Sequence, residues 1–128
     1  MTIAEVSKRF GLSIDTLRYY ERIGLIPKVR RNKSGIRDYE EADCVRIEFV
    51  KCMRGAGIPV DALAEYVALS QQGDATALAR KQILVEQRDL LLVRMEELQK
   101  TLDRLNAKIQ RYEKILLPME KELQRKDP

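Results

Sequence analysis

Apolar residues recur at helical spacing from the start of the chain. Ile3, Val6 and Phe10 stand three and four positions apart with polar residues between them, which predicts a short amphipathic helix that ends at Gly11. A second short helix is expected over residues 13–22, where a hydroxyl and a carboxylate near its start can serve as caps. These two helices and the glycine-containing turn between them have the arrangement of a helix-turn-helix.

The pattern changes after Pro27. Val29 and residues 36–39 are predicted to form short strands, and the polar residues 32–35 between them are typical of a turn, with a glycine available for positive φ. We therefore expect a small hairpin next to the second helix, which is the wing of a winged helix-turn-helix.

Two further helices are predicted after the wing. Residues 40–56 carry a broad apolar face, and Gly57 marks the end of this helix. Apolar residues then recur from Val60 to Ala68, and the polar residues 71–74 close the fourth helix. The core that these helices build should be small, because only 5% of the 128 residues are aromatic.

The second half of the chain has a different period. From Leu91 onward, apolar residues alternate four and three positions apart, with no internal glycine or proline before Pro118, which is the heptad pattern of a coiled coil. A narrow apolar stripe on one long helix, expected over about residues 75–117, cannot bury itself against a small domain. Homodimerisation is the simplest way to bury it. The residues predicted to form this dimer seam are Leu91, Met95, Leu98, Leu102, Leu105, Ile109, Tyr112 and Leu116.

The sequence therefore predicts a mainly α protein with three parts. Residues 1–73 should form a winged helix-turn-helix domain, and residues 74–118 a long helix for dimerisation. Residues 119–128 should form a charged tail that frays.

Positive charge is concentrated in the first part of the chain. The formal net charge of the whole chain is +4, and residues 1–57 carry 12 Lys and Arg against 8 Asp and Glu, so the whole surplus lies there. Residues 28–37 contain five basic residues and no acidic one, as an electrostatic footprint on phosphates requires. A solvated charge run is the alternative interpretation of this segment.

The second helix carries side chains that suit nucleic acid. Arg18 can address a guanine edge with two hydrogen bonds or grip a phosphate, and the hydroxyl groups of Tyr19 and Tyr20 can reach phosphates. The structural alternative for Arg18 is a surface ion pair with Asp15 or Glu21. The second helix of a helix-turn-helix enters the major groove, so we expect these side chains to contact double-stranded DNA.

Other classes of function lack their residues in this sequence. The chain has no His and no paired carboxylates in a plausible pocket, so we expect neither an enzyme nor a cofactor. No stretch has the ~18 consecutive apolar residues of a membrane span, and the N-terminus lacks the apolar core of a signal peptide. Two cysteines are too few for a disulfide framework, and we expect thiols in a cytoplasmic protein.

With these motifs in place, the chain resembles the MerR family of transcriptional regulators along nearly its whole length. The resemblance is carried by the opening helix through residues 10–11, the run LRYYERIGLIP at residues 17–27, the end of the wing at residues 37–39, the helix at residues 43–57 and the terminal coiled coil. It implies a bacterial regulator, associated with the nucleoid, that dimerises through an antiparallel coiled coil. It also implies that the dimer binds a pseudo-palindrome in a promoter and bends and untwists the DNA to control transcription by RNA polymerase.

The resemblance assigns DNA contacts to particular positions of this chain. Tyr20 stays open between a contact and a packing role, and Leu17 and Ile23 are expected to pack. The residues that match contacts of the recognition helix are Ser13, Thr16, Arg18 and Tyr19, and those that match contacts of the wing are Arg31, Lys33, Gly35, Arg37 and Tyr39.

The resemblance also suggests a trigger at Cys52. The short family members that this chain is most similar to respond to thiols and aldehydes through one cysteine at this position. A thiolate that adds to a small electrophile, or that is oxidised, could change the packing of the DNA-binding domain. An inert thiol is the alternative, because Glu48 lies one turn back and the end of the helix is negative.

Two other sites are not expected. No Cys or His follows Cys52, so the thiolate or imidazole ligands of a soft-metal site are missing. The chain ends just past its coiled coil, so we expect no large C-terminal domain for binding drugs.

Cys44 should be a core residue, because a free cysteine behaves as a small apolar side chain.

Two rival functions remain at the level of sequence. One is a coiled-coil interaction protein whose N-terminal domain binds another protein. The other is an architectural DNA-binding accessory factor without a small-molecule trigger. Sequence-specific DNA binding separates the regulator from the first rival, and an effect on transcription separates it from the second.

Overall fold

The computed structural model describes residues 1–126. It divides into two compact units, Met1–Val85 and Glu86–Pro128, so the predicted domain boundary at residue 73 falls inside the first unit. The elements, in chain order, are α1 (Ile3–Phe10), α2 (Ile14–Arg22), α3 (Glu41–Gly55), α4 (Val60–Ser70), the 3-10 helix η1 (Asp74–Thr76), α5 (Ala77–Arg111), the π-helix η2 (Tyr112–Leu116) and α6 (Leu117–Lys126).

The first two helices are set by their end caps. The Thr2 side chain accepts a hydrogen bond from the backbone N–H of Glu5, whose carboxylate bonds back to Thr2, so α1 begins with a capping box. Gly11 ends α1 with φ at 64°, a left-handed conformation that glycine adopts without strain. Ser13 caps α2 in turn. The predicted helix-turn-helix is therefore present, with the expected turn.

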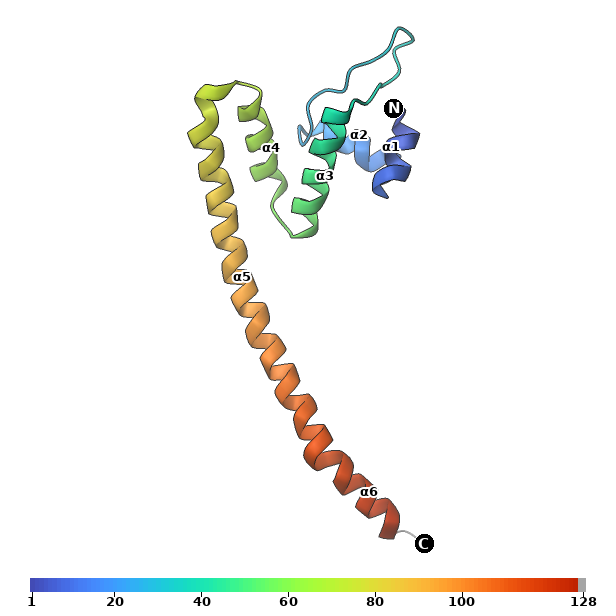
Figure 1. Cartoon of the computed structure of the whole chain (residues 1–128), viewed down its shortest axis with the longest axis vertical. Helices are drawn as coiled ribbons and strands as arrows, with labels where there is room; N and C mark the ends of the chain where they lie inside the picture. The colour runs from blue at the N-terminus through green and yellow to red at the C-terminus, as the bar shows by residue number, and fades with distance from the viewer. Residues whose placement is uncertain (127–128) are drawn as a thin grey trace. The chain divides into compact units, whose positions relative to one another are not determined.

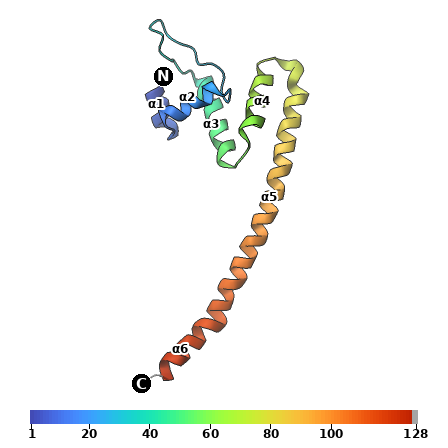
Figure 2. The ribbon, with the colours of Figure 1, turned by 180° about the vertical axis from the view of Figure 1, so that it is seen from behind.

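The core of the first unit is made by the faces of α1 to α4. The chain reverses direction after α3 and again after α4, as both views of the ribbon show (Figures 1 and 2). The turn after α2 and the two ends of the wing also contribute residues to this core. The buried apolar residues are Val6, Leu17, Tyr20, Leu25, Ile26, Val29, Tyr39, Cys44, Ile47, Val50, Ile58 and Leu63.

The wing differs from the predicted hairpin. Within residues 1–126 there is no β-strand, and the wing has one isolated antiparallel bridge, between Arg31 and Arg37. The prediction of short strands at Val29 and residues 36–39 is therefore wrong. The polar side chain of Asn32 explains the difference, because it binds the backbone N–H groups of Ser34 and Ile36 and gives the segment a local alternative to strand pairing.

The second unit is helical and exposes its apolar residues. No side chain described between residues 86 and 124 is buried. No helix among the described residues has the length and apolar character that crossing a membrane requires.

The end of the chain also differs from the prediction. The model continues as a helix past Pro118 to Lys126, so the tail expected to fray is helical over residues 119–126, and residues 127–128 of that tail lie outside the described part. The π-turn explains how: the N–H of Leu117 donates to the carbonyl of Tyr112, and a new α-helix then starts at Leu117. Pro118 thus lies in a first turn, where a missing N–H costs little.

Candidate nucleic-acid interface

The start of α2 uses two predicted contact residues for its own cap. The backbone N–H of Thr16 donates to Oγ of Ser13 over 3.0 Å, and the two hydroxyl groups lie 2.8 Å apart. Ser13 is exposed and Thr16 is half-buried. Both hydroxyls remain at the surface at the positive end of the helix, where an anion such as phosphate is stabilised.

Arg18 and Tyr19 follow on the exposed side of α2. The guanidinium of Arg18 lies 4.0 Å from the carboxylate of Asp15, and the two side chains are 54% and 96% exposed. An ion pair this long and this exposed contributes little, so Arg18 remains available to a ligand. Tyr19 is also exposed, and the guanidinium of Arg22 lies over its ring, 5.5 Å from the centroid.

The tip of the wing is a polar turn with exposed basic side chains. Gly35 adopts φ 76° and donates its N–H to the carbonyl of Asn32, which closes the turn. Arg31 donates to the carbonyl of Gly35 over 2.8 Å, and Lys33 is exposed. The wing thus presents cationic groups and a glycine backbone at its surface, as binding to a phosphate backbone requires.

Arg37 connects the wing to α2 instead of pointing freely into solvent. Its Nε donates to Oε1 of Glu21 over 3.0 Å, and the two side chains are 20% and 13% exposed. The predicted recognition helix and the predicted wing are therefore joined by a direct, partly buried ion pair.

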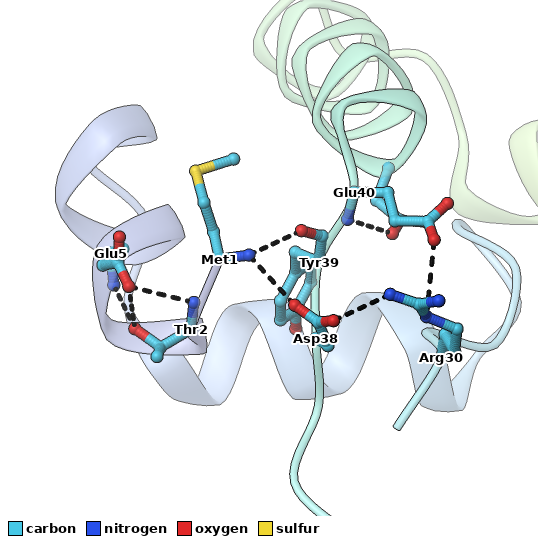
Figure 3. Close-up of polar contacts among 8 residues, drawn as sticks. Met1, Thr2, Glu5, Arg30, Asp38, Tyr39 and Glu40 are labelled. Carbon is cyan, nitrogen blue, oxygen red and sulfur yellow. Dashed lines mark hydrogen bonds and ion pairs between the residues drawn. The ribbon is translucent and has the colours of Figure 1, made fainter. Parts of the chain in front are cut away.

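The base of the wing is held by a chain of polar contacts (Figure 3). The amino group of Met1 donates to Oδ1 of Asp38 over 3.2 Å and to the carbonyl of Tyr39 over 2.7 Å. Arg30 donates to the other oxygen of Asp38 over 2.8 Å and lies 3.4 Å from Glu40. The bond from the Met1 amino group, followed by that from Arg30, lowers the pKa of Asp38 below its usual value.

Two predicted contact residues belong to the core. Tyr39 is 2% exposed, which corrects the prediction that its side chain meets DNA at the surface, and Tyr20 is 7% exposed, which favours the packing role that was left open for it. Burial raises the pKa of both phenols. The hydroxyl of Tyr39 is buried and has no hydrogen-bond partner within the described residues.

The two cysteines have different surroundings. Cys44 is 1% exposed, which confirms the prediction that it is a core residue, and burial raises the pKa of its thiol. Cys52 is exposed, in the last turn of α3. No group of three or more His, Cys, Asp or Glu side chains among the described residues could hold a metal ion.

The seam residues are available to a partner. Six of them are about half exposed or more, from 48% at Tyr112 to 68% at Leu98, while Leu91 and Leu116 are half-buried. An apolar stripe of this length at the surface is typical of an interface with another protein. The stripe lies on α5 up to Ile109, and Tyr112 and Leu116 lie in the π-helix.

Sequence reasoning missed several residues that shape the interface. Glu21 was considered only as a neighbour of Arg18, whereas its partner is Arg37. Asp38 was not assigned a contact, and Arg30 was considered only as part of the basic segment 28–37, yet both hold the base of the wing. Opposite charges in the wing and in α2 were a usable signal, but sequence separation alone does not show which pairs meet.

Family models and known proteins match the chain over most of its length. The model described as "MerR HTH family regulatory protein" matches residues 1–69, and the model described as "MerR, DNA binding" matches residues 44–108. The HTH-type transcriptional regulator AdhR from Bacillus subtilis (strain 168) is 58% identical over 92 residues, which are 72% of this chain and 66% of AdhR. The matched region thus spans slightly less than two thirds of that relative.

Solved structures have the same fold. A crystal structure assigned to the MerR family of transcriptional regulators, from Listeria monocytogenes, superposes with a TM-score of 0.94 at 44% identity and covers 98% of this chain and 95% of the other. The crystal structure of HiNmlR, a MerR family regulator lacking the sensor domain and bound to promoter DNA, superposes with a TM-score of 0.80 at 27% identity, covering 88% and 90% of the two chains.

Proposed function

The chain belongs to the MerR HTH family of regulatory proteins, and we propose that it is a transcriptional regulator that binds a promoter pseudo-palindrome as a dimer and distorts the DNA. The observation that carries the proposal is the exposed set of DNA-compatible groups on α2 and the wing, with the two elements joined through Glu21 and Arg37. The solved structure of HiNmlR on promoter DNA supports it.

Each part of the interface has a separate task in this proposal. Arg18 and Tyr19 read base edges and phosphates in the major groove, because they are exposed on the second helix of the helix-turn-helix. Arg31 and Lys33 hold the phosphate backbone from the wing, with the backbone of Gly35 close to the DNA. The polar tip of the wing allows this approach without burying apolar surface.

The dimer follows from the exposed seam of α5. Leu98 and Leu102 lie in the middle of a stripe that has no partner among the described residues. We propose that a second copy covers this stripe in an antiparallel coiled coil, so that each dimer carries two copies of α2. A two-fold dimer matches a pseudo-palindromic site, because each half-site meets the same surface.

We further propose that Cys52 is the trigger. It is the exposed cysteine, whereas Cys44 is buried, so a reagent in solution reaches Cys52 first. Its thiolate adds to the carbonyl carbon of an aldehyde; the new C–S bond forms as the C=O π electrons move to oxygen, which takes up a proton. The product lies at the end of α3, next to the turn into α4.

The proposed place and class follow from the same role. A dimer that acts with RNA polymerase at a promoter works in the bacterial cytoplasm, at the nucleoid, and needs no cofactor. We propose that it is not an enzyme, in keeping with relatives that are transcriptional regulators. An untriggered interaction protein or architectural factor is the weaker candidate, because neither accounts for membership of a family of regulators.

DNA selection and binding test the main proposal. The purified chain should select an inverted repeat from a random duplex library, with an affinity that falls steeply as salt rises. Arg18→Ala should weaken binding to that repeat by about 1–3 kcal/mol and relax the sequence preference at one position of each half-site. Unchanged affinity and preference in this variant would show that α2 does not read the DNA.

Transcription with and without an aldehyde tests the trigger. The assay uses purified polymerase and a promoter that contains the selected inverted repeat. Formaldehyde or methylglyoxal should change transcript levels for the wild-type protein and for Cys44→Ser, but not for Cys52→Ser. If Cys52→Ser responds like the wild type, the thiol trigger is wrong. If no promoter responds to the protein at all, the architectural role replaces the regulatory one.

A further inference from the structure

We propose that Glu21 is a positioning residue for DNA binding, which acts through Arg37 to fix the wing beside α2. The inference rests on the proposed function, because it concerns affinity for DNA. Glu21 belongs to α2 and Arg37 to the wing, 16 positions later in the chain, and the Arg37 Nε–Glu21 Oε1 distance is 3.0 Å. The pair is a direct bond between the two elements that are to meet the DNA.

The other contacts that orient the wing lie at its base, where Met1 and Arg30 bind Asp38. Within the described residues, its two sides pair through the bridge between Arg31 and Arg37 and through the backbone hydrogen bonds from Asp38 to Arg30 and from Asn32 to Ile36. Even a complete two-stranded hairpin is marginally stable by itself, so this short pairing does not fix the direction of the wing against α2. Val29 and Tyr39 anchor its two ends in the core, but residues 31–36 between them are exposed. The contact between Arg37 and Glu21 therefore supplies the side-chain tie from the wing to α2, next to the exposed residues 31–36.

Burial makes this contact effective. Arg37 and Glu21 are 20% and 13% exposed, whereas the Arg9–Glu41 pair, which joins α1 to α3, is 44% and 69% exposed. Water screens a partly buried pair less than a surface pair, and removing one partner leaves the other charge in a poorly hydrated place. Loss of Glu21 should therefore release Arg37 from its position and let the wing move.

Charge and position predict opposite effects of removing Glu21. An acidic side chain at a DNA-binding surface repels phosphates, so electrostatics alone predicts that Glu21→Gln binds DNA more tightly. If Glu21 positions the wing, the same change weakens binding to the specific site, because the cationic groups of the wing no longer stand at the right place before binding. The sign of the change therefore distinguishes the two roles.

Glu21→Gln and the matched control Glu41→Gln test the proposal by fluorescence anisotropy. Both substitutions remove one negative charge and one ion pair with an arginine from the first unit. Glu21→Gln should weaken binding to the selected inverted repeat about tenfold, while binding to a scrambled duplex stays the same or tightens. Glu41→Gln should leave the ratio of the two affinities unchanged. A Glu21→Gln variant that binds the repeat as tightly as the wild type would overturn the inference.

A double-mutant cycle tests whether Glu21 acts through Arg37. In an Arg37→Gln background, Glu21→Gln should change affinity for the repeat by less than about twofold. A change this small is within the scatter that such cycles show for sites without coupling. A second tenfold loss would mean that Glu21 acts by another route, against the proposal. A wild-type chain that prefers no duplex would overturn the proposed function, and this inference with it.

The free protein provides a readout that does not depend on DNA. The amide NMR signal of Gly35, at the tip of the wing, should shift or broaden in Glu21→Gln and stay in place in Glu41→Gln. Thermal unfolding shows whether Glu21→Gln is folded. If it is not, Glu21→Asp, which retains the carboxylate on a shorter side chain, is measured instead, and the Gly35 signal and the affinity for the repeat should change in the same direction. An unchanged Gly35 signal in a folded variant counts against the proposal.

Discussion

The two units of this chain treat their apolar residues in opposite ways. In the first unit, Met1–Val85, residues such as Leu17 and Ile47 are completely buried, and the helices cover one another. In the second unit, no side chain described before residue 125 is buried, and Leu98 is 68% exposed. The first unit can therefore fold around its own core, whereas the second unit has an apolar surface of the kind that is typical of an interface with another molecule.

This difference separates the surface proposed to contact DNA from the surface proposed to hold two copies of the chain together. The side chains that we propose to face DNA lie on a unit whose core fixes them, so their geometry does not require a partner chain. In the proposed dimer, the seam supplies no DNA-contacting groups, but it sets the distance between the two copies. Substitutions in one unit should therefore leave the fold of the other intact. The predictions below concern the seam, the core of the first unit and its surface.

The largest effect is expected in the seam. In the proposed dimer, Leu98→Lys puts a charge into the seam from both copies, and losing two buried leucines costs about 3–6 kcal/mol before the charge is counted. The dissociation constant of the dimer, measured by analytical ultracentrifugation, should rise by about two to four orders of magnitude. Binding to an inverted repeat should fall with it, while the first unit stays folded.

Leu90→Lys is the control for that experiment. Leu90 is 58% exposed and lies on the same helix, but the heptad pattern places it outside the seam. The Leu90→Lys variant should remain a dimer. If both variants stay dimeric, the seam is assigned to the wrong face of α5.

The next effect is expected in the core of the first unit. Leu17→Ala removes a side chain with no exposed surface and should lower the free energy of unfolding by about 2–5 kcal/mol. Ile36→Ala, at a position 57% exposed in the wing, should change it by less than about 0.5 kcal/mol. Urea unfolding followed by circular dichroism measures both, and equal losses would contradict the division between core and surface.

The smallest effect is a pH dependence at the surface of the first unit. Hydrogen bonds from Arg9 lower the pKa of Glu41 below its ordinary value. A carboxyl group whose folded-state pKa is depressed stabilises the fold above the ordinary pKa, and this contribution disappears as pH falls through the lower value. The stability difference between wild type and Glu41→Gln should therefore shrink from pH 7 to pH 3, and a difference that grows would show that the pair does not act in this way.

The helical part of the fold could be predicted from the sequence, because it depends on local signals. Periodicity gave α1 to α4 and the long helix, and the cap at Ser13 and the glycine turn at Gly11 are where the pattern places them. The burial of Cys44 also followed from its character, because a free cysteine behaves as a small apolar side chain. Each of these features is determined by residues within a few positions of one another.

The features that the sequence misled us about depend on distant contacts or on competing local ones. Tyr39 matches a family contact position, but its ring fills the core between helices that are far away in sequence. The wing lacks strands because the Asn32 side chain satisfies backbone groups that a ladder would have paired. A proline normally ends a helix, and the π-turn before Pro118 could not be foreseen from helix propensity.

The central claim is that one seam holds two copies of α2 at a fixed separation on the DNA. The most direct test inserts about five base pairs, half a helical turn, between the half-sites of the selected inverted repeat. We predict that affinity, measured by anisotropy, falls to that of a duplex with a single half-site, because the second half-site then faces the opposite side of the DNA. Equal affinity for the original and the lengthened repeat would contradict the account.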